Sequence, residues 1–476
     1  MTLLHSIFPN PEEMTAVLGG GISGLAAAYY LKTLGSSSRI LVFEASHRLG
    51  GWINSTTHED GTVYELGPRT LRAAGNAGAN TLALAESLGL TEKIISINYS
   101  HASTKNRMIQ VNGKLHKLPN SLKTAFTKSP PFSKPLALYA LKDLFAKKVI
   151  NSDESLFSFV NRRFGLEVAN YAIDPMTRGI FAGNARDLSV LSLAKRMHEV
   201  EQQYGSVLGG LLKDRKNAEK PDSALTKCEL VKQARKEKWA VWSLLGGLEC
   251  FVKVLEEKLL QDGIEIRRNT PVKGIKKSGR KLVVQTEEEE MEIKNLVSCL
   301  PSRNLSTIVS SVSLELATLL GSIPYTTVGV VNLEYPGHLL NEPAFGYLVP
   351  SSEPNKVLGV IFDTCTFPQG DRTILTVMMG GYWFESLFGN NPPLESLLDV
   401  AMKEVKETLK ISIKPVRHKV SILKDCIPQY NVGHFERVHN SRKLIHDLKL
   451  PLTLAGNSYD GVGVNDAIMS ARKAVL

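Results

Sequence analysis

The pattern of apolar and polar positions in the first fifty residues predicts a strand, a helix and a second strand. Residues 15–19 form a short apolar run typical of a buried strand, and residues 25–34 repeat apolar positions with helical spacing. Residues 39–44 form a second apolar run, which ends in an acid. Together they predict one βαβ unit, the repeat of parallel sheets covered by helices.

The remaining chain changes pattern several times, which predicts more than one domain. Residues 136–150 have the spacing of an amphipathic basic helix, and residues 154–212 have a mainly helical pattern. Residues 325–385 alternate like the strands of a sheet. Residues 242–300 and 451–464 return to strand and helix patterns around glycine turns. We therefore expect the first domain to be assembled from both ends and the middle of the chain.

Composition agrees with a large globular protein and limits its partners. The 476 residues are 43% hydrophobic, enough to bury the cores of about two or three domains. A formal net charge of +10 favours anionic partners, such as a carboxylate substrate or an acidic membrane surface. Nucleic-acid binding would need basic residues interleaved with stacking aromatics or a known module, and the sequence contains neither.

The cysteines and the first residues exclude several classes of protein. Five cysteines stand far apart with no CxxC or Cys/His spacing, so neither a metal site nor a disulfide framework is indicated. This usage is typical of a protein that is not secreted. No run of about 18 apolar residues predicts a membrane-spanning helix. The first thirteen residues contain two glutamates and no arginine, so we expect no cleavable targeting sequence.

A glycine-rich turn joins the first predicted strand to its helix. Gly19, Gly21 and Gly24 have the GxGxxG spacing, which permits a tight turn and lets the backbone approach a pyrophosphate at the helix N-terminus. Glu44 stands about 20 residues beyond the last glycine, where an acid accepts hydrogen bonds from ribose hydroxyls. An ordinary glycine loop is the alternative, but strand, helix, second strand and acid all fall in register. The sequence therefore predicts a dinucleotide site.

A second glycine pair follows the acid and narrows the choice of dinucleotide. Arg48, Gly50, Gly51 and Trp52 extend the signature beyond Glu44. The extension resembles the longer signature of the FAD-binding amine-oxidase superfamily, in which Arg48 and the glycine turn would pack against the far side of the diphosphate. A simple NAD dehydrogenase does not need this extension, so we expect FAD.

Further motifs resemble one family within that superfamily. The general motifs are GGGISG (19–24), RLGGW (48–52), GGLE (246–249) and AGNSYDGVGV (455–464). More specific stretches are ELGPRTLR (65–72), PPFSKP (130–135), RGIFAGNARDLSV (178–190), AFGYLVPSSE (344–353) and CIPQYNVGH (426–434). These stretches resemble the oxygen-dependent protoporphyrinogen oxidases of animals and fungi, and the resemblance covers nearly the whole chain from residue 15 onward.

The resemblance implies an α/β fold in three parts. They are a discontinuous Rossmann-like FAD-binding domain (14–95, 240–300 and 420–476), a β-sheet substrate-binding domain (96–113, 213–239 and 301–419) and a helical membrane-binding domain (114–212). The lysine-rich segment 114–150 would then dock on an anionic membrane surface. Judged on its own, such a stretch could equally be a solvated helical face.

The resemblance also implies the reaction and its setting. Family members oxidise protoporphyrinogen IX to protoporphyrin IX, the penultimate step of haem synthesis; FAD takes the hydrogen equivalents and molecular oxygen reoxidises it, giving hydrogen peroxide. They are usually homodimers on the intermembrane-space face of the mitochondrial inner membrane. Ferrochelatase is a further expected partner.

The resemblance assigns non-covalently bound FAD to loops from several parts of the chain. Val272 would lie near the adenosine, and the helix that starts after Gly463 would stabilise negative charge on the reduced ring. The full set of implied cofactor residues is Gly19, Gly20, Gly21, Ile22, Ser23, Gly24, Glu44, Ala45, Arg48, Gly51, Trp52, Gly67, Pro68, Arg69, Thr70, Val272, Val462, Gly463 and Val464.

Two arginines match family positions for the substrate, an apolar macrocycle with two propionates. Such a substrate needs a mostly apolar site with one or a few cations. Arg69, in the Gly-Pro-Arg turn, presents a planar fork that can bind a carboxylate bidentately; packing against FAD or an internal acid is the alternative. Arg107 matches a further family arginine, and a surface position competes with that role.

The walls of the substrate site are implied by the same resemblance. The matching residues are Phe345, Gly346, Leu348 and Met378, which on pattern alone would be sheet core. Phe345 could stack on a pyrrole ring, and Gly346 could leave room for close approach. No general base is assigned, because the cofactor carries the hard step and the protein orients and desolvates the substrate.

Two other functions are compatible with the same fold. A flavin amine oxidase would be expected to have an aromatic cage and often a cysteine-linked flavin near the C-terminus, where this chain reads AGNSYDG without cysteine. A flavin-free binding protein of this architecture would purify without flavin. The intact glycine loop at 19–24, Glu44 and the segment 462–464 argue against the second alternative.

Overall fold

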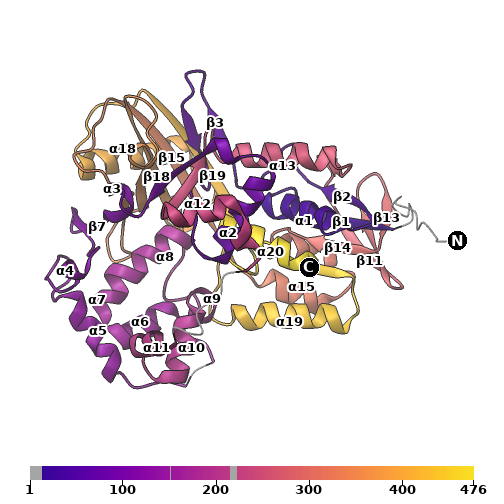
Figure 1. Ribbon diagram of the computed structural model, residues 1–476, viewed down its shortest axis with the longest axis horizontal. Helices are drawn as coiled ribbons and strands as arrows, with labels where there is room; N and C mark the ends of the chain where they lie inside the picture. Colours follow the sequence, from indigo (N-terminus) through magenta and orange to yellow (C-terminus); the bar gives the residue numbers. More distant parts are fainter. Residues whose placement is uncertain (1–12, 151, 215–221) are drawn as a thin grey trace. The chain divides into compact units, whose positions relative to one another are not determined.

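The computed structural model describes residues 13–150, 152–214 and 222–476 and contains both helices and sheets (Figure 1). The chain forms two compact units. Unit 1 comprises Met1–Ser96, Asp222–Pro324 and Glu436–Leu476, and unit 2 comprises Ile97–Pro221 and Tyr325–Phe435. Unit 1 therefore draws on both ends and the middle of the chain, as the sequence patterns predicted for the first domain.

Unit 1 is built on a five-stranded parallel sheet. In spatial order its strands are β10 (Glu265–Arg267), β2 (Arg39–Phe43), β1 (Met14–Leu18), β14 (Asn295–Ser298) and β20 (Leu452–Leu454). β1 and β2 are buried along almost their whole length, which explains why both are continuous apolar runs in the sequence. The predicted βαβ unit is confirmed, with its helix α1 at Ile22–Thr33.

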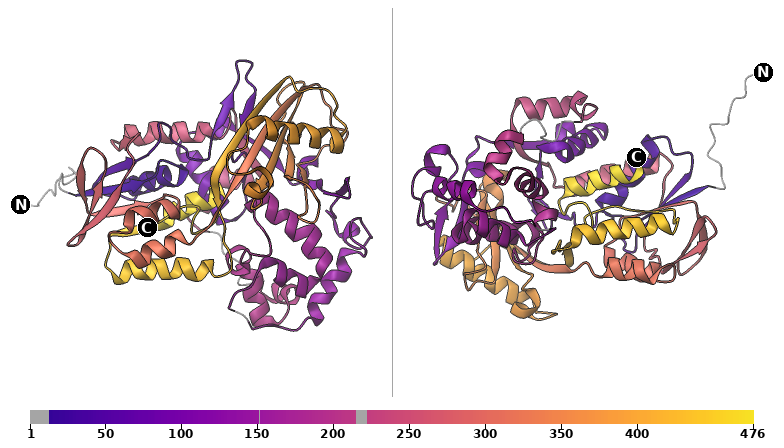
Figure 2. Two further views of the ribbon diagram at one scale, coloured as in Figure 1. Left: turned by 180° about the vertical axis from the view of Figure 1, so that it is seen from behind. Right: turned by 90° about the horizontal axis from the view of Figure 1, so that it is seen from below.

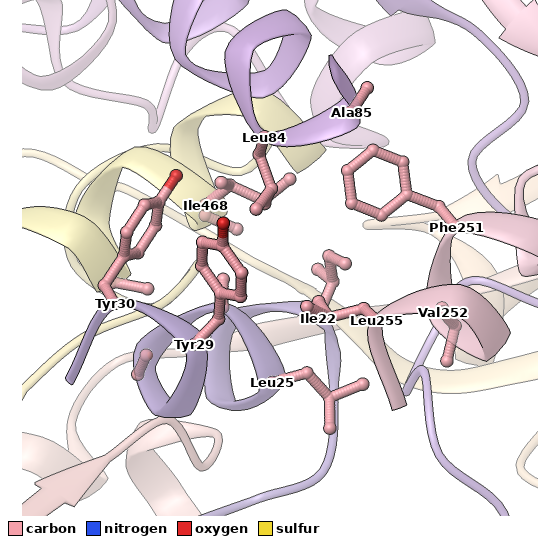
Figure 3. Packing of buried hydrophobic residues seen from close by; sticks show 14 of the residues in the cluster. Ile22, Leu25, Tyr29, Tyr30, Leu84, Ala85, Phe251, Val252, Leu255 and Ile468 are labelled. Atoms are coloured by element: carbon pink, nitrogen blue, oxygen red, sulfur yellow. The ribbon is translucent and has the colours of Figure 1, made fainter. Parts of the chain in front are cut away.

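The main core of unit 1 surrounds α1. Residues 22–30 of this helix are all buried, which agrees with its apolar character on every side. Figure 3 shows side chains of α1, α2 (Gly75–Ser87), α13 (Glu249–Gln261) and α20 (Val464–Val475) gathered in one cluster. This core therefore forms only when distant parts of the chain have come together.

Unit 2 is built on a seven-stranded sheet. Its spatial order is β19 (Arg417–Pro428), β15 (Tyr325–Pro336), β18 (Arg372–Gly381), β17 (Val357–Phe362), β16 (Gly346–Leu348), β7 (Arg107–Val111) and β8 (Lys114–Lys117). Neighbouring strands are antiparallel except β16 and β7, which are parallel. The sheet predicted for residues 325–385 is confirmed. On one face, a core that includes Val377 and Met379 packs against α18 (Leu394–Leu409).

Residues 154–212 are mainly helical, as predicted, and form a small bundle with the helix before them (Figures 1 and 2). Its helices include α5 (Leu136–Phe145), α6 (Leu156–Phe164), α10 (Lys195–Tyr204) and α11 (Val207–Lys213). Phe159, Val160 and Val207 contribute to its apolar core. Across the described ranges 13–150, 152–214 and 222–476, no helix has the length and apolar composition needed to cross a membrane.

A buried ion pair attaches α5 to this bundle. Arg163 Nε donates to Asp143 Oδ1 at 2.6 Å, and both side chains are fully buried. Ser206 Oγ and the Leu208 N–H donate to the second carboxylate oxygen at 2.7 and 2.8 Å. Burial favours the neutral acid, but the hydrogen bonds to Asp143 outweigh burial and lower the pKa of this carboxyl.

The helix expected over residues 136–150 is shorter than predicted and ends at Phe145. Ala146 has an extended backbone, and Arg163 Nη1 donates to the carbonyl oxygens of Ala146 and Lys147 at 3.0 and 3.5 Å. These contacts satisfy carbonyl groups at the point where the helix stops. The prediction of a helix was therefore wrong for residues 146–150. Arg163, which binds the carbonyl groups of Ala146 and Lys147, lies in α6, so the local pattern did not indicate where α5 ends.

The expected domain boundary at residue 240 differs from the structure. Residues 213–239 were expected in the substrate domain, but Asp222 onward belongs to unit 1. The reason is a contact between α12 (Glu229–Lys236) and α2, in which Glu86 Oε2 accepts the N–H of Leu230 at 2.5 Å. This contact joins residues far apart in sequence, so the local pattern did not indicate it.

Three further segments also differ from the expected domains. Residues 301–324 belong to unit 1, where the N–H of Ser302 donates to Ser458 Oγ at 3.2 Å. Residues 420–435 belong to unit 2, because β19 pairs with β15. Residues 114–212 form no separate compact unit and are grouped with the sheet of unit 2.

Candidate functional site

The glycine turn between β1 and α1 has the geometry that its sequence predicts. Gly19 has a φ of +97°, which favours glycine, and a Cβ on Gly24 would lie 1.8 Å from the Gly19 carbonyl oxygen. α1 begins at Ile22, inside the motif, with no side chain capping its N-terminus and no acid in its first turn. Its first N–H groups and the positive end of its dipole therefore suit a phosphate group.

Glu44 follows β2 and holds the glycine turn in place. Its Oε2 accepts the N–H of Gly20 at 2.7 Å, and its Oε1 accepts the N–H and the Oγ–H of Ser46, both at 2.8 Å. A carboxylate has about four acceptor positions, so these three bonds leave capacity for a ribose hydroxyl. The N–H of Thr270 donates to the Glu44 carbonyl oxygen at 2.9 Å, which brings the chain at Val272 to the same end of the sheet.

Neither Ser46 nor Thr270 was predicted to take part in this site. Ser46 had a local signal, because a hydroxyl residue two positions after an acid readily closes a hydrogen-bonded turn. Thr270 had none, since its contact with Glu44 joins distant segments. Both residues fix the carboxylate and its backbone without needing to touch a nucleotide.

The second glycine pair packs directly on the first glycine turn. A parallel β-bridge joins Gly21 to Gly50. Arg48 donates to the carbonyl oxygens of Gly51 and Ile53 at 2.6 and 2.5 Å. The guanidinium therefore secures its own turn, a role that the sequence did not indicate, and the turn itself lies beside the dinucleotide loop as expected.

Arg69 lies in a tightly packed turn before β5 (Leu71–Arg72). A Cβ on Gly67 would lie 2.1 Å from the Trp52 carbonyl oxygen, so this turn lies against the residue that follows the second glycine pair. Ser243 Oγ donates to the Arg69 carbonyl oxygen at 3.0 Å. The Arg69 residue is only 8% exposed, so it is not a surface arginine.

The C-terminal glycine turn lies beside the start of α1. A Cβ on Gly456 would lie 3.4 Å from Ser23 Oγ. α20 begins at Val464, and Asp466 in its first turn accepts the N–H of Gly463 at 3.3 Å. Burial raises the pKa of the Asp466 carboxyl. An ionised Asp466 would offset the positive end of α20, so the expected effect of this helix on a reduced flavin depends on the protonation of Asp466.

The structure thus gathers the predicted cofactor residues in one unit. The glycine turn, the ribose acid, the second glycine pair, the Arg69 turn, Val272 and residues 462–464 all belong to unit 1. The uncapped N-terminus of α1 and the remaining acceptor capacity of Glu44 fit the diphosphate and ribose of a dinucleotide. Among the described residues, no group of three or more His, Cys, Asp or Glu side chains could hold a metal ion.

The predicted substrate-wall residues lie together in the sheet of unit 2. Phe345 directly precedes β16, which contains Gly346 and Leu348. Met378 of β18 lies across the intervening strand β17. Arg107, the first residue of β7, is in register with Gly346. Residues predicted from three separate stretches therefore share one region of the sheet.

Leu348 and Met378 lie on the face of the sheet opposite α18. Their neighbours Tyr347 and Met379 belong to the core beneath α18, and successive side chains of a strand point to opposite faces. Phe345, Leu348 and Met378 are each partly exposed. Partial exposure distinguishes these side chains from the buried core that their sequence pattern alone would predict.

Gly346 meets a steric requirement of the sheet itself. Its φ is +140°, and a Cβ at this position would lie 2.1 Å from the Val360 carbonyl oxygen of β17. Close approach of a ligand was the expected reason for a glycine at this position. The neighbouring strand is sufficient to explain it.

Comparisons with known proteins agree with this architecture. Residues 22–475 match the family described as Flavin containing amine oxidoreductase. The chain is 40% identical to the protoporphyrinogen oxidase of Bos taurus over 465 residues, with 96% of each chain covered. It is 39% identical to the protoporphyrinogen oxidase of Homo sapiens, with 97% of each chain covered.

Solved structures extend the comparison to the fold. A crystal structure from Exiguobacterium sp. 255-15 matches with a TM-score of 0.78 and 23% identity, over 97% of this chain and 98% of that chain. Cyclohexylamine Oxidase from Brevibacterium oxydans IH-35A matches with a TM-score of 0.68 and 15% identity, over 98% of both chains. At these identities the likeness concerns the fold alone.

Proposed function

Because this chain belongs to the flavin containing amine oxidoreductase family, and within it to the protoporphyrinogen oxidases, we propose that it uses molecular oxygen as final acceptor and releases hydrogen peroxide. The chain is an FAD-dependent oxidoreductase that converts protoporphyrinogen IX to protoporphyrin IX in haem biosynthesis. One observation carries this conclusion: 39–40% identity to two mammalian protoporphyrinogen oxidases over at least 96% of each chain.

Residues of unit 1 would hold the cofactor. FAD, when bound, takes up the hydrogen equivalents that leave the substrate. The N-terminus of α1 would bind its diphosphate, and Glu44 would accept a ribose hydroxyl. The turn at residues 67–70 and the start of α20 would contact other parts of the cofactor. The chain thus contributes binding and orientation to the reaction.

Substrate recognition combines cations with apolar surface. Arg69 would bind a propionate carboxylate, and its burial would keep this attraction from being screened by salt. In unit 2, the partly exposed Phe345, Leu348 and Met378 offer apolar contacts for the macrocycle, and Arg107 begins the adjacent strand. The apolar groups of unit 2 would exclude water from the porphyrinogen.

We also propose that α5 docks the protein on an anionic membrane surface, at the intermembrane-space face of the mitochondrial inner membrane. The inward side of α5 carries the fully buried Asp143, whereas Leu138, Leu141 and Leu144 are half exposed and Phe145 is 85% exposed. This arrangement is the reverse of an ordinary surface helix, whose apolar side faces the core. Lysines of the same segment would add attraction to anionic lipids.

Two partner proposals follow from the family and need separate tests. We propose that the protein is a homodimer and that it passes its product to ferrochelatase. Light scattering of the purified protein would give its mass in solution. A coupled assay, in which porphyrin is consumed without release to solution, would test the transfer.

An aerobic assay with protoporphyrinogen IX tests the main proposal. Porphyrin fluorescence is followed after the visible flavin spectrum has been recorded, and the rate of spontaneous autoxidation is subtracted. We expect flavin absorbance, enzyme-dependent porphyrin formation and hydrogen peroxide release. An Arg69→Ala variant should keep its flavin and lose most of this activity. A flavin-loaded but inactive wild-type protein would favour amine oxidation, and a flavin-free one would favour the binding-protein alternative.

A further inference from the structure

The helix α8 (Asp174–Phe181) lies against the same sheet region as the wall residues of unit 2. A Cβ on Gly179 would lie 2.4 Å from Leu348 Cδ2, so the helix and the side chain are in close contact. Arg178, the preceding residue, lies over the ring of Trp383, with 4.7 Å between the guanidinium carbon and the ring centroid. Trp383 packs in the same cluster as Met378. Arg178 is therefore held between two elements that carry wall residues.

Arg178 is a buried cation, and the Nε side of its guanidinium makes no hydrogen bond to the described residues. The residue is 3% exposed, and its Nη1 donates to the Val349 carbonyl oxygen at 2.6 Å. Its Nε is buried and has no hydrogen-bond partner among the described residues. The acid nearest in sequence on the same helix, Asp174, accepts the N–H and Oγ–H of Ser351 at 2.6 and 2.8 Å. The charge of Asp174 acts on Arg178 and favours its charged form, but among the described residues no carboxylate hydrogen bond to Arg178 is found.

Another buried arginine of unit 2, Arg163, has a hydrogen-bond partner for each nitrogen of its guanidinium. Arg163 directs its Nε to the Asp143 carboxylate, its Nη1 to the Ala146 carbonyl oxygen and its Nη2 to the Gly205 carbonyl oxygen. Every nitrogen of that guanidinium has a partner. Arg178 differs because only Nη1 is used.

An unpaired buried guanidinium is costly unless an anion joins it. Burial lowers the pKa of Arg178 to about 10, so the group still carries its charge at neutral pH. The Nε edge of an arginine offers two parallel donors that match the two oxygens of a carboxylate. Trp383 fixes the plane of the guanidinium and Val349 fixes its other edge, so the donors are oriented in advance.

We propose that Arg178 binds a carboxylate of the porphyrinogen substrate through its Nε edge, as an anion-binding residue additional to Arg69 and Arg107. The inference rests on the proposed oxidation of protoporphyrinogen. The substrate carries two propionates, and Leu348 and Met378 would contact its apolar ring beside this cation. Arg178 would thus fix the orientation of the macrocycle on the sheet of unit 2.

Paired substrates test this role directly. Protoporphyrinogen IX is compared with its dimethyl ester, which keeps the ring and lacks the charges. Arg178→Gln keeps a donor for Val349 but removes the charge. Loss of a charge-assisted bidentate contact should raise KM for the diacid roughly 10- to 100-fold. The KM for the ester should change much less, by under about threefold, because the ester has no carboxylate and therefore loses no charge-assisted contact.

Two further variants keep the test independent of folding. Arg178→Lys keeps the charge but not the fork and should give an intermediate KM for the diacid. Arg186→Gln is the matched control, since Arg186 also lies over an aromatic ring, 3.7 Å from the centroid of Phe157, and is exposed. It should behave like wild type with both substrates. Equilibrium binding of protoporphyrin IX, followed by fluorescence, gives a readout without turnover.

The outcomes separate the inference from the proposed function. If Arg178→Gln is impaired equally with the diacid and the ester, the residue is structural and the inference is overturned. If Arg178→Lys binds protoporphyrin IX as tightly as wild type, the bidentate contact is overturned. A wild-type protein that oxidises neither substrate overturns the proposed oxidation itself, and with it the role of Arg178.

Discussion

Replacing Gly24 by alanine separates a steric requirement of the dinucleotide loop from a conformational one. Gly24 lies within α1 and needs no unusual backbone angle. The new Cβ would lie 1.8 Å from the Gly19 carbonyl oxygen, whereas real Cβ atoms essentially never come closer than 3.0 Å. The turn at Gly19 would therefore have to move by about 1.2 Å. That movement falls on the segment that faces the diphosphate.

The size of the effect follows from this displacement. Overpacking at a rigid contact costs about 1–3 kcal/mol, and about 1.4 kcal/mol corresponds to a tenfold change in affinity. If the strain is relieved by opening the loop, FAD binding weakens by roughly 10- to 100-fold. The rest of unit 1 should stay folded, because most side chains of its core lie outside the loop, many of them on α2, α13 and α20.

Gly35→Ala is the matched control, because it imposes only a conformational cost. Gly35 follows α1 with a φ of +86°, and a Cβ there would meet nothing within 4 Å. A left-handed alanine costs roughly 1–2 kcal/mol, so this variant should unfold at a lower temperature and keep its FAD. Flavin absorbance per protein after dialysis and a flavin fluorescence titration measure the difference. Full flavin retention in Gly24→Ala, or equal loss in both variants, would refute the steric argument.

Three other predictions concern unit 2. Arg163→Met leaves Asp143 buried without its cation, so the free energy of unfolding in denaturant should fall by about 3–5 kcal/mol; a fall below about 1 kcal/mol would contradict the pairing energy expected for a buried ion pair. Because the pKa of Asp143 is lowered in the folded protein, its contribution to stability is present above the usual value of 3.8 and is lost as the pH falls through the lowered pKa. Asp143→Asn should therefore lower the thermal unfolding temperature at pH 7 and change it progressively less as the pH falls below the usual value of 3.8 through the lowered pKa of Asp143. Replacing Leu141 and Phe145 together by glutamate should abolish sedimentation of the protein with anionic vesicles, while oxidation of the substrate in detergent continues. As a control, Leu260→Glu, at a similarly exposed leucine of α13, should leave sedimentation unchanged. If the double variant still binds the vesicles as wild type does, α5 is not the membrane-binding element.

Local sequence patterns predicted the elements that local chemistry determines. The apolar runs at residues 15–19 and 39–44 and the glycine turn between them correspond closely to β1, β2 and the start of α1. The helix was expected from residue 25, yet it begins at Ile22, because the last glycine of the motif packs on the first from inside the helix. The discontinuity of unit 1 was also predictable, since strand and helix patterns recur in three separate stretches.

Features set by distant contacts could not be predicted. The end of α5 depends on Arg163, and the place of residues 222–239 depends on Glu86. Arg178 stands in a stretch that resembles the family, but nothing in its neighbours indicates that it is buried with one edge unused. The partners of a guanidinium are fixed by the fold, and a single sequence does not contain that information.

The assembly of unit 1 has a consequence for how the protein is made. α1 is apolar on every side, and one of its main neighbours, α20, is synthesised more than 400 residues later. At roughly 5–20 residues per second, this delay lasts on the order of 20 to 90 seconds. Throughout that time the newly made α1 lacks the part of its native cover that α20 provides, so apolar side chains of α1 are open to non-native contacts. A premature stop codon just before α20 should therefore leave the core of unit 1 incomplete, although almost the whole chain has been made.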